Sequence, residues 1–176
     1  EDAGDPTHST ETEATTTVAN TWETLTFDFA TPASGAAAIN PAYTYNRASL
    51  FFNFGTDGAT AGAKTYYFDD LTFGGGTTPP PGFAPITFDD AAVSYTLTGF
   101  GEVIATQVAD PTGGTNQVGQ AVKPVTAPTW AGVTVSTGPN NTVAVIPLTL
   151  TASKMTVRVY SPDIGIPVRL KVEDAG

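Results

Sequence analysis

The sequence contains no cysteine. The chain therefore has no disulfides, no thiolate metal ligands and no cysteine nucleophile. Bases are also scarce, with 7 lysines and arginines against 17 aspartates and glutamates, which gives a net charge of −10. Phosphate backbones and anionic lipid surfaces repel a protein with this charge. We therefore expect neither nucleic acid nor membrane as a partner.

Long hydrophobic runs and helical periodicity are missing as well. No run approaches the roughly 18 apolar residues of a transmembrane helix. No segment keeps an apolar period of 3.6 residues over the length of a stable helix, so helix should be minor. The absence of cysteine, the few lysines and the many threonines and glycines fit a secreted, extracellular or cell-surface bacterial protein.

Catalytic motifs are equally sparse. A Ser–His–Asp triad would need His8, which is the only histidine, and no Gly-x-Ser-x-Gly motif occurs. Glu11 and Glu13 lie on one face of a predicted strand. Paired carboxylates can hydrolyse glycosides, but two of them at this spacing are ordinary on an exposed strand. We therefore expect no enzymatic activity.

The patterns that are present belong to β-strands. Residues 22–29 place Leu25, Phe27 and Phe29 on one face, and residues 155–160 and 168–173 alternate in the same way. The segment "SPDIGIP" between the last two has the composition of a hairpin connection. These patterns predict an all-β fold, a jelly-roll β-sandwich.

A glycine- and proline-rich segment divides the chain. Residues 74–85, "GGGTTPPPGFAP", have the composition of a linker. Residues 1–73 and 86–176 flank it, and the strand patterns continue on both sides. We expect the two flanking parts to be halves of one composite sandwich domain.

The chain also ends as it begins, with "EDAG" at residues 1–4 and again at 173–176. Such a repeat predicts one period of a longer repeating chain, or a circularly permuted module cut at this seam. Because the ends of a sandwich often lie close together, permutation is readily tolerated. The two halves would then complete each other within one chain, or by strand exchange with a neighbouring copy.

Read from residue 86 through 176 and on from 1 to 73, the chain resembles a known kind of module. The segments "VYSPDIGIPVRLKVED", "TTTVANTWETLTFDF" and "YYFDDLTF" carry the resemblance. The similarity is to the galactose-binding-like, jelly-roll carbohydrate-binding modules of secreted bacterial polysaccharide-degrading proteins. It implies non-catalytic binding of a polysaccharide. The alternative is a structural repeat of a surface fibre, adhesin or extracellular filament, in which neighbouring copies exchange strands.

The resemblance also implies a structural calcium ion. Two acidic pairs, Asp69–Asp70 in "YYFDDLTF" and Asp89–Asp90 in "ITFDD", come from predicted strands on opposite sides of the linker. In the resembling modules the corresponding strands lie side by side, and carboxylates with backbone carbonyls suit Ca²⁺. The other interpretation is that these aspartates only end strands and cap turns.

Basic and aromatic residues on the polar strand faces are candidates for sugar contacts. If residues 154–160 and 168–173 form a hairpin, Arg158, Tyr160, Arg169 and Lys171 make one patch, with Tyr160 as a stacking surface. The alternative interpretation is a set of cross-strand ion pairs with Glu11, Glu13 and Glu173. A further candidate for an exposed stacking platform is Trp130, whereas Trp22 is expected to be structural.

Overall fold

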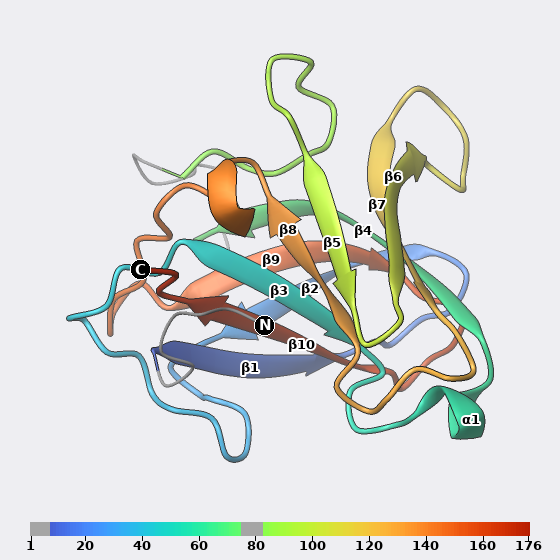
Figure 1. Cartoon of the computed structure of the whole chain (residues 1–176), viewed down its shortest axis with the longest axis horizontal. Helices are drawn as coiled ribbons and strands as arrows, with labels where there is room; N and C mark the ends of the chain where they lie inside the picture. Colours follow the sequence, from blue (N-terminus) through green and yellow to red (C-terminus); the bar gives the residue numbers. More distant parts are fainter. Residues whose placement is uncertain (1–7, 75–82) are drawn as a thin grey trace.

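A computed structural model describes residues 8–74 and 83–176 of the chain. Two antiparallel five-stranded sheets pack face to face, which confirms the predicted all-β sandwich (Figure 1). Sheet A has the order β1 (Ser9–Thr15), β10 (Pro167–Glu173), β3 (Arg47–Phe52), β8 (Gly132–Ser136) and β5 (Thr96–Phe100). Sheet B has the order β2 (Trp22–Asp28), β9 (Lys154–Tyr160), β4 (Lys64–Phe73), β7 (Gln117–Lys123) and β6 (Ile104–Ala109).

Helix is minor, as predicted. In the described part of the chain it comprises α1 (Gly58–Ala61) and a single 3-10 turn, Pro139–Asn141. The carboxylate of Asp57 caps α1 by accepting a hydrogen bond from the backbone N–H of Thr60, 2.8 Å away. No helix among these residues has the length and apolar character needed to cross a bilayer.

The core fills the space between the two sheets. Leu25, Phe27 and Phe29 are buried there, as their alternation predicts. Sheet A contributes Phe52, whose ring stacks on that of Tyr66 from sheet B with 4.9 Å between centroids and 7° between planes. Aromatic contacts of this kind join the two layers.

Strands from the two halves of the chain alternate over four of the five positions in each sheet, and β5 and β6 add a second-half strand at one edge. β1, β3, β8 and β10 pair in sheet A, and β2, β4, β7 and β9 pair in sheet B. In these pairings every strand of residues 8–73 has its partners among strands of residues 86–176. The first half therefore has no ladder of its own among its described residues.

The predicted hairpin across residues 161–167 is wrong. β9 belongs to sheet B and β10 to sheet A, so the connection crosses from one sheet to the other. It is fixed by hydrogen bonds from Thr16 N to Ile166 O at 3.0 Å and from Gly165 N to Thr16 O at 2.8 Å. Its proline and glycine make a turn, but the apolar faces of the flanking strands pack from opposite sides of the core.

The segment after the linker is also less regular than its sequence predicts. The expected strand "ITFDD" is reduced to one bridge between Ile86 and Leu71. Most of the linker, residues 75–82, lies outside the described residues, as does the first copy of EDAG. The second copy begins at the last residue of β10, Glu173, and the next residue, Asp174, donates its N–H to His8 O at 2.9 Å. The end of β10 therefore lies beside the start of β1.

A buried lysine ties the two sheets together at one end of the sandwich. Lys123, at the end of β7, is 2% exposed. Its ammonium group donates to the carbonyls of Phe52 at 3.2 Å, Asn53 at 3.1 Å and Thr56 at 2.9 Å. All three donors of the ammonium group are thus satisfied by the turn that follows β3. Burial lowers the pKa of Lys123, and the nearby carboxylate of Asp57 partly opposes this shift.

Candidate functional site

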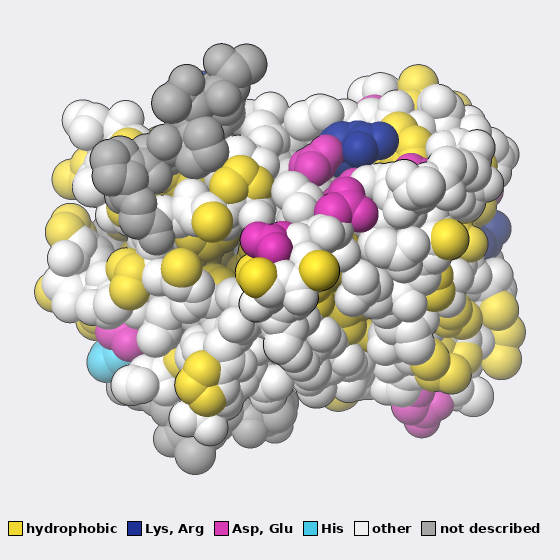
Figure 2. All heavy atoms as spheres, turned by 90° about the horizontal axis from the view of Figure 1, so that it is seen from above, with side chains coloured by type: hydrophobic (Ala, Val, Ile, Leu, Met, Phe, Trp, Pro, Cys, Tyr) yellow, Lys and Arg dark blue, Asp and Glu magenta, His cyan; other side chains and the backbone are white. Residues whose placement is uncertain are grey.

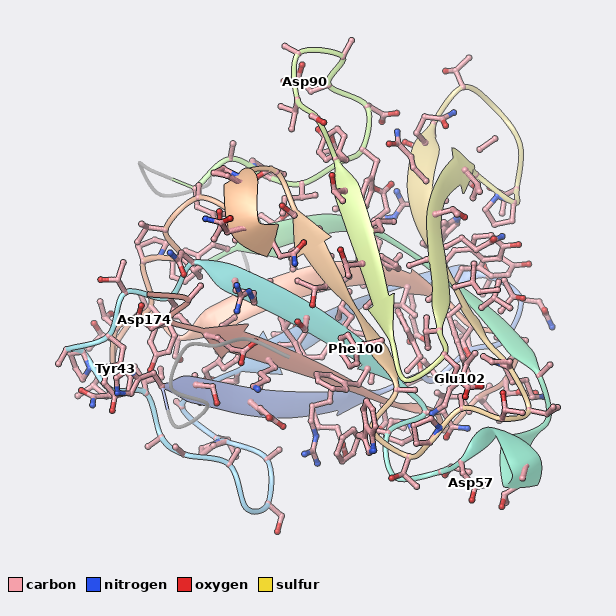
Figure 3. All side chains as sticks on the ribbon, viewed as in Figure 1. Tyr43, Asp57, Asp90, Phe100, Glu102 and Asp174 are labelled. Atoms are coloured by element: carbon pink, nitrogen blue, oxygen red, sulfur yellow. The ribbon has the colours of Figure 1, made fainter. Side chains whose placement is uncertain are left out.

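The outward face of sheet A is hollowed into a groove of about 1230 Å³. Its lining comes from all five strands, from residues 34–36, from the 3-10 turn and from residues 174–176. Phe100 and Asp174 lie at opposite ends of this face (Figure 3). The groove therefore spans all five strands, and its two ends along the strand direction differ chemically.

One end is aromatic. Trp130 is 50% exposed, and its ring lies nearly parallel to that of Phe100, with 6.4 Å between centroids and 10° between planes. Phe51 meets Phe100 edge to face at 5.3 Å and Phe54 at 5.7 Å. A Cβ on Gly132 would lie 2.7 Å from the Phe100 ring, so glycine is what lets this ring approach the strand. Trp130 is thus exposed, as a stacking platform requires, and its contact with sugar stays a prediction.

Sequence reasoning missed the three phenylalanines of this end. Alternation in "ASLFFNFG" predicts Phe54 inside with Leu50 and Phe52. β3 ends at Phe52, however, and the following turn places Phe54 among the groove residues. Phe51 lies on the outward face of β3 yet is only 9% exposed, because the neighbouring rings cover it. A period-two pattern cannot reveal an aromatic cluster outside the core.

A row of polar side chains crosses the middle of the groove. In the strand register Glu11 faces Lys171, Lys171 faces Ser49, and Ser49 faces Thr134. The row ends at Thr98, which faces Thr134. Ser49 Oγ and Thr134 Oγ1 are 2.9 Å apart, and Thr98 Oγ1 donates to the side chain of Asn141 at 3.1 Å. The row combines hydroxyl, amide and charged groups.

Two bases of the groove, Arg169 and Lys171, form ion pairs with carboxylates. Arg169 reaches Glu11 at 3.1 Å and Glu13 at 3.4 Å, and its guanidinium lies 3.6 Å from the centroid of the Phe54 ring. Lys171 pairs with Glu173 at 2.7 Å. The interpretation as cross-strand ion pairs is therefore confirmed for Arg169, whereas Lys171 pairs with an acid of its own strand, β10.

Arg47 is the third base of the groove and lies at its polar end. It donates to the carbonyl oxygens of Asn140 at 2.9 Å and Asn141 at 3.2 Å. Both asparagines have positive φ values of 56° and 57°, a conformation that asparagine tolerates better than most residues. The turn thus directs two carbonyls at one guanidinium.

The predicted patch of four residues is wrong. Arg169 and Lys171 line the groove of sheet A together with Trp130, whereas Arg158 and Tyr160 project from β9 in sheet B. The outward faces of the two sheets point to opposite sides of the sandwich. The error follows from the assumed hairpin between β9 and β10.

On sheet B, Tyr160 lies between two other aromatic rings. Trp22 and Tyr67 each meet it edge to face with 5.7 Å between centroids. Arg158 lies over the Trp22 ring at 4.7 Å, and the indole N–H donates to Asp110 at 3.1 Å. Because these rings and the indole N–H already have partners within the chain, the arrangement fits the predicted structural role of Trp22.

The four predicted calcium ligands have other partners. Asp69 and Asp70 pair with Arg158 at 3.5 and 3.1 Å. Asp89 accepts from Gln117 N and Asp90 from Ala92 N, both at 2.9 Å. Over residues 8–74 and 83–176, no three histidine or acidic side chains form a group that could hold a metal. The turn-capping interpretation holds for Asp90, and calcium binding stays a prediction.

Asp69 is the most perturbed carboxylate beneath the sheet B face. It is 1% exposed, and burial raises its pKa to about 6, although hydrogen bonds from Asn116 and Asp70 N oppose the shift. Asn116 Nδ2 links it to Asp110, with 3.0 and 3.1 Å to the two carboxylates. Burial acts on Asp110 as well, but hydrogen bonds from Thr112, Trp22 and Asn116 outweigh it and lower its pKa to about 2.

Replacing Asp69 should change how stability depends on pH. A carboxyl with a folded-state pKa of about 6 and a reference value of 3.8 binds more protons when folded, so its contribution to stability falls as pH rises from 4 to 6. Asp69→Asn should remove this loss, of up to about 3 kcal/mol, and raise the melting temperature at pH 7 relative to pH 4.5. Thermal unfolding of the wild type and of Asp69→Asn at pH 4.5 and pH 7 measures these melting temperatures.

The control for this experiment is Asp90→Asn, which removes the same charge from an exposed turn. It should leave the difference in melting temperature between pH 4.5 and pH 7 as in the wild type. If Asp69→Asn keeps the wild-type difference in melting temperature between pH 4.5 and pH 7, another group must titrate between these two pH values.

Comparison with known proteins assigns no family or function to this chain. No family model matches the chain, and no curated protein or solved structure matches it. The groove of sheet A, with its aromatic end and its polar row, is therefore the basis for a functional argument.

Proposed function

We propose that this chain is a non-catalytic, extracellular carbohydrate-binding module that holds a polysaccharide in the groove of sheet A. The observation that carries the proposal is the half-exposed Trp130 ring, parallel to Phe100, beside a row of hydroxyl and amide groups. Pyranose rings have one apolar face and a rim of hydroxyls. A site that joins aromatic surface to a few placed polar groups suits such ligands.

Three of the residues predicted from the sequence contribute to this proposal. Trp130 supplies the stacking surface, and Arg169 and Lys171 lie on the floor of the groove. Arg158 and Tyr160 are no part of it, because they belong to the opposite sheet. The carboxylates beside the bases are held in ion pairs, an arrangement suited to binding rather than to acid–base catalysis.

The proposal is tested by removing the platform. Trp130→Ala should reduce retention on polysaccharide affinity gels at least about tenfold, because truncating a central aromatic anchor typically costs 2 kcal/mol or more. The fold should persist, since half of this side chain is already exposed. Native affinity electrophoresis through gels with embedded polysaccharide measures the retention.

Tyr160→Ala is the matched control, because it removes an aromatic ring from the outward face of the other sheet. Its retention should equal that of the wild type. Equal losses in both variants would point to general destabilisation. Loss in Tyr160→Ala alone would place the sugar on sheet B and contradict the assignment to the groove.

A structural repeat of a fibre is the second candidate. The observation that favours it is the contact between Asp174 and His8, which brings the end of β10 to the start of β1. In a repeating chain, the EDAG segment that ends one copy would lead from β10 directly to a β1 strand beside it. Electron microscopy separates the candidates, since filaments support the fibre and monomeric particles support the binding module.

A further inference from the structure

We infer that the groove takes a stretch of several sugar residues from a neutral polysaccharide and rejects chains that carry uronate or sulfate groups. This inference rests on the carbohydrate-binding function proposed above. It specifies the chemical class of the ligand, and it follows from the charges and the shape of the groove.

The first observation is that each base in the groove is already engaged. Arg169 holds two carboxylates, Lys171 holds Glu173, and Arg47 donates to two backbone carbonyls. An anionic sugar would have to displace Glu11 or Glu173 from its base. The displaced carboxylate would then lie unpaired beside the ligand, and such like-charge contacts cost several kcal/mol.

The second observation is the charge balance. Among the described lining residues, Glu11, Glu173 and Asp174 oppose three bases. The groove therefore offers no excess positive charge, and the whole chain carries −10. Charged side chains are also sparse on the face shown in Figure 2, which is turned by 90° from the view onto the groove. Long-range electrostatics thus repel polyanions and leave neutral chains unaffected.

The third observation is the kind of polar group that remains. Thr98 and Asn141 present a hydroxyl and an amide at the exposed part of the groove, and the buried hydroxyls of Ser49 and Thr134, which hydrogen-bond each other, lie in its floor. A hydroxyl can donate one hydrogen bond and accept two, and an amide offers both roles. These groups match sugar hydroxyls, which also do both, better than they match a carboxylate or sulfate, which only accepts.

The fourth observation is length. The groove is lined from β1 at one edge of the sheet to β5 at the other. Neighbouring strands lie about 4.8 Å apart, so four spacings give a floor about 19 Å wide. This is longer than one sugar ring. The groove therefore fits a run of sugars that crosses the strands, with one ring on Trp130.

Wild-type retention tests the inference directly. Native affinity electrophoresis would compare neutral polysaccharides (β-glucan, galactomannan, xylan) with anionic ones (alginate, polygalacturonate, carrageenan). At least one neutral chain should retain the protein about tenfold more strongly than any anionic chain, which corresponds to 1.4 kcal/mol. Raising salt from 50 to 500 mM should change neutral retention less than about twofold, because no ion pair forms with the ligand. For the retained polymer, a hexasaccharide should bind more tightly than a disaccharide.

A gain of function tests the role of the ion pairs. Glu11→Gln with Glu173→Gln frees Lys171 and one side of Arg169 while keeping the side-chain shapes. Retention on polygalacturonate at 50 mM salt should rise at least about tenfold and fall again at 500 mM salt. Asp57→Asn with Asp90→Asn is the matched control, since it removes two charges outside the groove lining. It should leave retention on polygalacturonate unchanged.

The outcomes separate the inference from the function on which it rests. Wild-type protein that prefers an anionic chain, with binding lost in Trp130→Ala, overturns the neutral specificity and leaves carbohydrate binding in place. Retention on no polysaccharide overturns both. Equal gains in the groove variant and in its control overturn the role assigned to the ion pairs.

Discussion

Residues 1–73 produced alone are expected to remain unfolded. Each of their four strands pairs only with strands from residues 86–176, so without the second half the described residues lose every strand ladder. Unpaired strands with one apolar face are not stable in water and tend to aggregate. Circular dichroism and heating should show no cooperative transition in this fragment.

The second half provides the matching experiment. Adding residues 86–176 should restore a cooperative transition, because the missing strands then return to both sheets. A soluble, monomeric 1–73 fragment with a cooperative transition of its own would contradict the pairing pattern. Restoration in trans would also show that strand exchange between copies is physically available to this sequence.

Lys123→Met is expected to destabilise the protein strongly. Methionine fills the space of the lysine stem but donates no hydrogen bond, so the carbonyls of Phe52, Asn53 and Thr56 lose their common donor. Each buried acceptor left unsatisfied costs about 1–3 kcal/mol. We expect a loss of about 3 kcal/mol or more in the free energy of unfolding, measured by chemical denaturation.

The control for this variant is Lys154→Met. Lys154 is exposed, and its ion pair with Asp28 is long, at 3.6 Å. Surface pairs of this kind contribute less than about 1 kcal/mol, so the loss should be small. Similar losses in the two variants would mean that Lys123 supplies only its hydrocarbon stem to the packing.

The fold class was predictable because the strand signal is local. Alternation at Leu25, Phe27 and Phe29 places one face inside, and the structure buries all three. The crossover between the sheets at residues 161–167 was not predictable from its composition. Proline and glycine mark where a strand ends, whereas the sheet that the next strand joins depends on partners more than a hundred residues away, such as Arg47–Phe52 for β10.

The groove shows the same limit. Trp130, Arg169 and Lys171 were recognised one at a time as polar-face or exposed residues, and all three line it. Phe100 was missed, because its position depends on contacts with Trp130 and with Phe51 that the sequence separates by 30 and 49 positions. Surfaces built from distant strands become visible only when the register is known.

The place of β10 bears on how the chain is made. This strand comes after the other nine described strands along the chain, yet it lies inside sheet A between β1 and β3. Within the described residues, β6 and β7 are the only consecutive strands that pair with each other, so little native pairing is available early. While a ribosome still holds residues 167–173, β1 has no partner in its sheet. Nascent chains of this sequence should therefore stay open, and susceptible to proteases and chaperones, until residues 167–173 have left the ribosome.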